Sequence, residues 1–135
     1  MPSRWADEPR WTRLAVTTLV LLLAWGCLQH LLDFATDGPR PYTDAPTWLA
    51  TYWSALTALD PLAAVLLAFR FRTGVLLAPT ILLTDVAANG YAIHVLDLGG
   101  SLAPIGQAVV SFLALASAAL ALHLLRPASS RSDVR

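Results

Sequence analysis

Apolar residues along the chain gather into four long runs separated by short polar stretches. The runs cover residues 14–32, 48–69, 75–96 and 105–125. A helix rises about 1.5 Å per residue and needs about twenty apolar residues to cross a hydrocarbon core about 30 Å thick, which matches each run. Membrane β-strands need only about ten residues in strict alternation, and these runs do not alternate. The pattern therefore predicts an all-α chain with four transmembrane helices.

The polar stretches between the runs are rich in turn-forming residues. Glycine and aspartate recur at 97–101, and the basic stretch at 70–74 is short enough to be a single tight turn. Connections this short place successive helices side by side and antiparallel. We therefore expect one up-down four-helix bundle over residues 13–126, with disordered polar tails at 1–12 and 127–135.

Arginine residues are distributed unevenly about the four runs. Arg40 is the only one in the loops after the first and third runs, and the other eight border the opposite side. Basic residues accumulate on the cytoplasmic side of membrane proteins. We therefore expect a multi-pass protein of the plasma membrane with both termini in the cytoplasm. The eight residues are Arg4, Arg10, Arg13, Arg70, Arg72, Arg126, Arg131 and Arg135.

The composition of the chain supports a lipid environment and gives no sign of a nucleic-acid partner. The 135 residues are 56% hydrophobic and 13% charged, whereas soluble domains are about 25% charged. The formal net charge is +0, so no basic excess points to nucleic acid. The sequence has no lysine, which is typical of high-GC bacterial coding, and it resembles the small four-span membrane proteins of such bacteria. The lipid bilayer is the partner that the composition predicts.

Two aspartates lie inside the apolar runs, where a charged carboxylate costs about 3 kcal/mol on insertion scales. Asp60 stands twelve residues before Arg72, and Asp85 stands twelve residues after Thr73. In an antiparallel hairpin that turns at Arg72 and Thr73, both aspartates reach the same depth, near the middle of the membrane. We expect them to face each other and to hold at most one negative charge.

Other polar residues share helical faces with these aspartates. Trp53, Thr57 and Asp60 recur at spacings of four and three, and Asn89 lies one turn after Asp85. Such a concentration of polar side chains within the membrane predicts a site for a ligand or an ion. The alternative is that these groups only bond the helices to one another, at about 0.6 kcal/mol for each interhelical hydrogen bond.

Prolines within the second and third runs add backbone acceptors to this region. Pro61 removes the donor that the carbonyl of Thr57 would use in a regular helix, and Pro79 does the same to Val75. Freed carbonyls beside membrane-embedded acids are typical of ion and ligand pockets.

A second group of polar residues lies toward the outer ends of the runs. His30 and Asp33 share a face of the first run, and we expect them to form an external cluster with His94 and Gln107. The spacings of histidines, cysteines and acids match no metal or haem motif, so the sequence predicts no cofactor.

Cys27 is the only cysteine, so no disulfide can form within the chain. The preceding Ala24 and Trp25 do not match a lipoprotein signal, and the apolar run continues beyond Cys27. We therefore expect an unmodified thiol within the membrane.

The fourth run carries small residues at spacings of four. Small residues let helices approach closely, either within the bundle or between copies in a homodimer or a larger membrane complex. They are Ala114, Ser117, Ala118 and Ala121.

Standard enzyme motifs, such as G-x-S-x-G and H-E-x-x-H, do not occur in the sequence. The positions of proline and polar residues in the second and third runs form a recognisable layout. Pro-Thr-Trp at 46–48 opens the second run, and Asp60 and Pro61 lie within it. Pro79 leads into a polar third run. This layout resembles the EXPERA family, which includes emopamil-binding sterol isomerases and sigma-2-type receptors. The resemblance implies four helices, cytoplasmic termini and an acid-lined intramembrane pocket for amines or sterols.

Together these observations favour a non-enzymatic membrane protein. We expect a pocket at Asp60, Asp85 and Asn89, bordered by Thr57 and Trp53, that binds a small cationic or lipidic ligand or a proton. Such a chain would act as a transport accessory or a ligand-binding subunit. The alternatives are a structural subunit of a larger membrane complex without a ligand, and a lipid isomerase like those of the EXPERA family.

Overall fold

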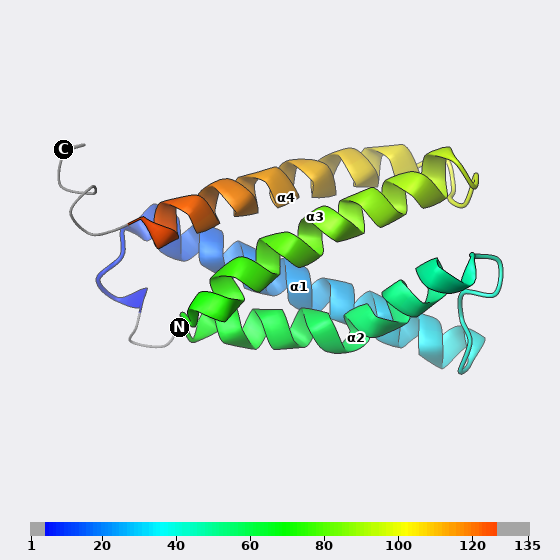
Figure 1. The fold of residues 1–135 in the computed structure, drawn as a ribbon, viewed down its shortest axis with the longest axis horizontal. Coiled ribbons are helices and arrows are strands. Elements are labelled where there is room, and N and C mark those ends of the chain that lie inside the picture. Colours follow the sequence, from blue (N-terminus) through cyan, green and yellow to red (C-terminus); the bar gives the residue numbers. More distant parts are fainter. Residues whose placement is uncertain (1–4, 127–135) are drawn as a thin grey trace.

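The computed structural model describes residues 5–126, and within that range the chain is all-α. Its four helices are α1 (Arg10–Asp37), α2 (Thr47–Ala68), α3 (Arg72–His94) and α4 (Ala103–Leu125) (Figure 1). The prediction of four helices is confirmed. Residues 1–4 and the predicted tail at 127–135 lie outside the described residues.

All four helices are long and apolar enough to cross a membrane. Many large apolar side chains point outward, which suits a lipid-facing surface and would be costly in water. Those that are most exposed include Leu14, Leu21, Trp25, Ile105, Phe112, Leu115 and Leu122. The chain therefore has the architecture of a helical membrane bundle.

The helix α1 is longer than the apolar run that predicted it. The run covers residues 14–32, whereas the helix begins at Arg10 and ends at Asp37. Polar residues beyond each end of the run continue the helix because none of them breaks it. Gly38 ends it with a φ of 81°, a conformation that glycine adopts without steric cost.

Helices that follow one another in the chain pack against one another, so that α2 lies between α1 and α3, and α3 lies between α2 and α4. Figure 1 shows the loops 38–46 and 95–102 at one end of the bundle, here called the loop end. The start of α1, the end of α4 and the short connection between α2 and α3 lie at the opposite end, the turn end. There α1 meets α4 through the rings of Trp11 and His123, whose centroids are 5.1 Å apart.

The connection between α2 and α3 closes with paired backbone hydrogen bonds. The amide of Phe71 donates to the carbonyl of Leu66 at 3.0 Å, and that of Arg70 donates to Leu67 at 2.9 Å. This is the Schellman arrangement, which usually places glycine where this chain has Arg70, at a φ of 60°. The next helix approaches so closely that Gly74 has no room for a β-carbon beside Leu66 and Leu67.

The segment before α1 packs under this connection. Trp5 is fully buried, and its Nε1 donates to the carbonyl of Ala68 at 2.8 Å. The guanidinium of Arg70 lies 5.1 Å from the centroid of the Trp5 ring and pairs with the carboxylate of Glu8. The prediction of a disordered tail is therefore wrong for residues 5–9, because a buried indole offsets the entropy lost by ordering so short a segment.

The small residues of α4 pack inside the chain. Ala114, Ser117 and Ala121 are buried in the bundle, and only Ala118 is partly exposed. Helix α4 packs mainly against α3 and only slightly against α1. Three of the four small residues therefore pack inside the chain, and a homodimer or larger complex through α4 stays a prediction.

Candidate functional site

A cavity of about 200 Å³ lies within the bundle, and all four helices contribute to its wall. The wall is mostly apolar, and its polar members are Gln29, His30, Asp60, Asp85 and Asn89. Among the arginines that the structure describes, none contributes to it. The cavity thus brings together the two central aspartates and one histidine from the expected external cluster.

Asp60 of α2 is inside the bundle, with only 4% of its surface exposed. Its carboxyl group lies against α1 at Gly26, where a β-carbon would come within 2.6 Å of Oδ2. Because glycine has no side chain, the Asp60 carboxyl reaches the backbone of α1 while Asp60 also lines the cavity.

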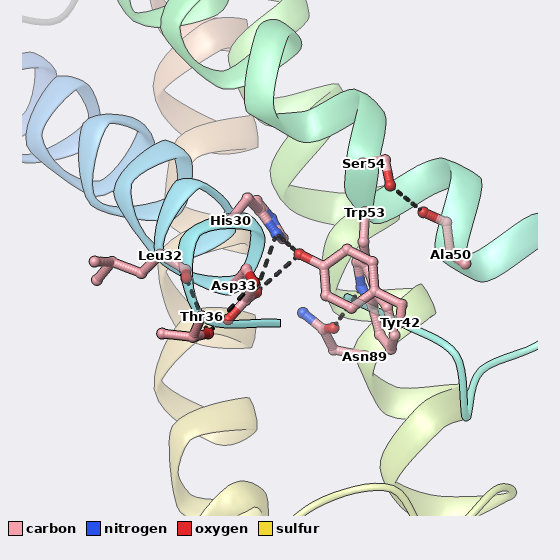
Figure 2. A network of polar contacts seen from close by, with 9 residues as sticks. All are labelled: His30, Leu32, Asp33, Thr36, Tyr42, Ala50, Trp53, Ser54 and Asn89. Carbon is pink, nitrogen blue, oxygen red and sulfur yellow. Dashed lines mark hydrogen bonds and ion pairs between the residues drawn. The ribbon is translucent and has the colours of Figure 1, made fainter. Parts of the chain in front are cut away.

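Asp85 of α3 faces the same cavity from the other side of the hairpin. Asn89 lies one helical turn after Asp85, and its side-chain oxygen accepts from Trp53 Nε1 at 3.0 Å (Figure 2). Oδ1 of Asp85 is buried, and none of the described groups bonds to it. A buried acceptor without a donor is unfavourable unless a ligand, a proton or water completes it.

The carbonyl that Pro61 frees has a partner on α1. The thiol of Cys27 donates to the backbone oxygen of Thr57 at 3.5 Å. The hydroxyl of Thr57 is buried, and the part of the chain that the structure describes supplies no partner for it. Thr57 therefore links α2 to α1 through its backbone, and it is not among the residues that line the cavity.

A three-residue polar cluster stands where the cavity approaches the loop end. The hydroxyl of Tyr42 donates to Asp33 Oδ2 at 2.8 Å and lies 2.7 Å from Nδ1 of His30 (Figure 2). The Tyr42 ring packs against Trp53 at a centroid distance of 5.1 Å and against Phe34 at 6.4 Å. Burial, the hydrogen bond to Asp33 and the charge of its carboxylate raise the pKa of Tyr42 well above its usual range.

Two residues expected in the external cluster lie elsewhere. Gln107 of α4 donates to the backbone oxygen of Val86 at 2.7 Å and so joins α4 to α3. His94 is exposed at the last position of α3. The structure brings His30 and Asp33 together without them.

Tyr42 is the functional candidate that the sequence did not reveal. The signal available was the pair His30 and Asp33 on one helical face, which leaves two polar side chains in need of a common partner.

Within residues 5–126, no three histidine, cysteine or acidic side chains lie close enough to hold a metal ion. The polar side chains of the cavity wall are two carboxyls, two amides and an imidazole. No family model matches the sequence, and no curated protein or solved structure matches it either. The layout resemblance to the EXPERA family therefore stays a prediction, and the chemistry of the cavity rests on its own geometry.

Proposed function

We propose that this chain is a non-enzymatic membrane protein whose cavity binds a small cation or a proton, as a ligand-binding subunit or a transport accessory. One observation carries the proposal. Asp60 and Asp85, from neighbouring helices, line one small cavity in which no arginine offsets their charge.

Electrostatics supports a cationic ligand. An ionised carboxyl at this depth costs about 3 kcal/mol on insertion scales, and two of them also repel each other. A bound cation or proton offsets both costs, whereas an anion would add to them. Liquid water takes up about 30 Å³ per molecule, so a cavity of about 200 Å³ has room for an organic amine of a few heavy atoms.

The orientation of the chain forms part of the proposal. We place the bundle in the plasma membrane with successive helices antiparallel, the turn end in the cytoplasm and the loop end outside. The arginine distribution supports this, because only Arg40 lies in the loops of the loop end. A reporter enzyme that functions in the cytoplasm should be active when fused after Arg135, and one that requires export should be inactive. The opposite result would show that the orientation is reversed.

Binding can be measured directly with the full chain in lipid nanodiscs. Methylammonium, butylammonium and sodium are titrated calorimetrically against the wild type and against Asp60→Asn and Asp85→Asn. Each substitution should weaken binding of the preferred cation about tenfold or more, equivalent to about 1.4 kcal/mol.

The matched control is Asp97→Asn, in the loop between α3 and α4. It makes the same chemical change outside the cavity, and asparagine accepts the φ of 55° found there. Binding to this variant should equal that of the wild type. Unchanged binding in all three variants would show that the cavity is not a cation site. The role of a structural subunit would then be favoured.

A further inference from the structure

Three hydrogen-bonding side chains lead from the loop end of the bundle to the cavity wall. The Asp33 side chain is 43% exposed, whereas that of His30 is 15% exposed and lines the cavity. Tyr42 lies between them, with its hydroxyl 2.8 Å from Asp33 Oδ2 and 2.7 Å from His30 Nδ1 (Figure 2). Both distances are those of strong hydrogen bonds, so the three groups are continuous.

The direction of these bonds determines where the protons are. The Tyr42 hydroxyl has one hydrogen, and the Asp33 carboxylate accepts it. His30 Nδ1 must therefore donate its hydrogen to the Tyr42 oxygen. In neutral His30 the other ring nitrogen, Nε2, then keeps its lone pair and can accept a proton.

We propose that Asp33, Tyr42 and His30 form a proton path between water at the loop end and the cavity. The proposal rests on the proposed function, because the carboxyls of Asp60 and Asp85 are the groups whose protons the path exchanges. Water in the cavity can join His30 to them, since the volume has room for several molecules and five of the lining side chains can bond water.

Each transfer moves one proton and changes no other bond. A cavity carboxylic acid gives its proton, through water, to His30 Nε2. Nδ1 passes its own proton to the Tyr42 oxygen, and the Tyr42 hydroxyl passes its original proton to Asp33. The products are a cavity carboxylate, a neutral His30 protonated on Nε2, an intact Tyr42 and a neutral Asp33. Asp33 then releases its proton to water, and the reverse sequence carries a proton inward.

The charged and titratable groups around the path favour protons as its cargo. Helix α1 supplies His30 and Asp33, and Asp60 and Asp85 face the cavity from α2 and α3. Helix α4 contributes only Val110 to the wall, which carries no charge. Among the described residues that line the cavity no fixed cation repels an entering proton.

The test measures how fast the cavity carboxyls change protonation and, separately, their final degree of protonation. The full chain in nanodiscs is subjected to a rapid pH jump, and infrared absorption follows the protonated carboxyl band that Asp60→Asn or Asp85→Asn removes. Tyr42→Phe deletes the hydroxyl but keeps the ring against Trp53, so it should slow the change about tenfold or more and leave the final degree of protonation unchanged. Asp33→Asn should act in the same direction, because an amide accepts the hydrogen bond but cannot carry the proton.

Tyr91→Phe is the matched control, since Tyr91 lies toward the loop end of α3 and packs on Trp48 away from the path. Its rate should equal that of the wild type. A wild-type rate in both Tyr42→Phe and Asp33→Asn would overturn the proton path alone. If the carboxyls of the wild-type protein do not change protonation after the pH jump, both the proton path and proton binding are overturned. Calorimetry would still decide whether the cavity binds a cation.

Discussion

Gly26 of α1 and Asp60 of α2 fit together so closely that a β-carbon on Gly26 would lie 2.6 Å from Oδ2 of Asp60. Glycine inside a helix costs roughly 0.5–1 kcal/mol relative to alanine. Here that cost allows a carboxyl group to lie directly against the backbone of the neighbouring helix. The fit also holds the Asp60 side chain at the cavity wall, so Gly26 positions a group that it does not itself supply.

Gly26→Ala should therefore disturb the site as well as the packing. The added methyl group must displace the Asp60 carboxyl, and overpacking of this kind costs about 1–3 kcal/mol. We expect a lower free energy of unfolding in mild detergent and weaker cation binding. Gly106→Ala is the control, because a β-carbon at Gly106 in α4 meets no atom within 4 Å. Equal stability and binding in the two variants would show that the Asp60 carboxyl has freedom to move.

Alkaline pH should destabilise the chain through Tyr42. The pKa of Tyr42 is raised in the folded state by burial, by its hydrogen bond to Asp33 and by the charge of that carboxylate. An unfolded chain ionises tyrosine at about pH 10, so the contribution of Tyr42 to stability is complete below that pH and is lost as the pH rises through the folded pKa. The free energy of unfolding should fall more steeply above about pH 10 in the wild type than in Tyr42→Phe. Parallel curves for the two proteins would contradict this.

The buried indole of Trp5 should contribute substantially to stability. Trp5 has no exposed surface and bonds the carbonyl of Ala68, which is one of the last carbonyls of α2. Trp5→Ala should lower the free energy of unfolding by about 3–5 kcal/mol, as expected for removing a buried aromatic side chain. Trp11→Ala is the control because Trp11 is 53% exposed, and its effect should be much smaller. A loss in Trp5→Ala well below this range would mean that the buried indole adds little to the stability of the fold.

The sequence predicts the helices and much of the central site because both depend on regular spacing. Apolar runs of membrane length indicate the four helices, and equal distances from the turn place Asp60 and Asp85 at one depth. The structure brings both to a single cavity. Pro61 likewise indicates a free carbonyl at Thr57, since the chemistry of proline is local.

Features that depend on how helices are rotated, or on loop conformation, could not be predicted in this way. The donor that meets the Thr57 carbonyl is Cys27, and only the rotation of α1 about its axis places that thiol there. Tyr42 reaches His30 because the loop after Gly38 turns back over α1, and loops carry no periodicity from which such a path can be derived. The small residues of α4 indicate close packing, but their pattern does not identify the helix that they face.

The two central aspartates should respond differently to an amide and to an apolar side chain. Asparagine at Asp60 or Asp85 keeps a polar group that can donate a hydrogen bond within the cavity, so we expect folding to change by about 1 kcal/mol or less. Leucine at either position removes the polar group with which the other acid could share a proton, and we expect a loss of about 1–3 kcal/mol. Unfolding in mild detergent measures the order of the four variants.

The double leucine variant separates folding from function. Replacing both members of a buried polar pair with apolar groups is often neutral or stabilising, because no uncompensated acid remains. The double variant should therefore be at least as stable as either single leucine variant, yet bind no cation. The asparagine variants should also lose binding while their bundle stays intact, which a purely structural role for the pair would not produce. If leucine and asparagine were equally harmless to both folding and binding, Asp60 and Asp85 would have no part in either.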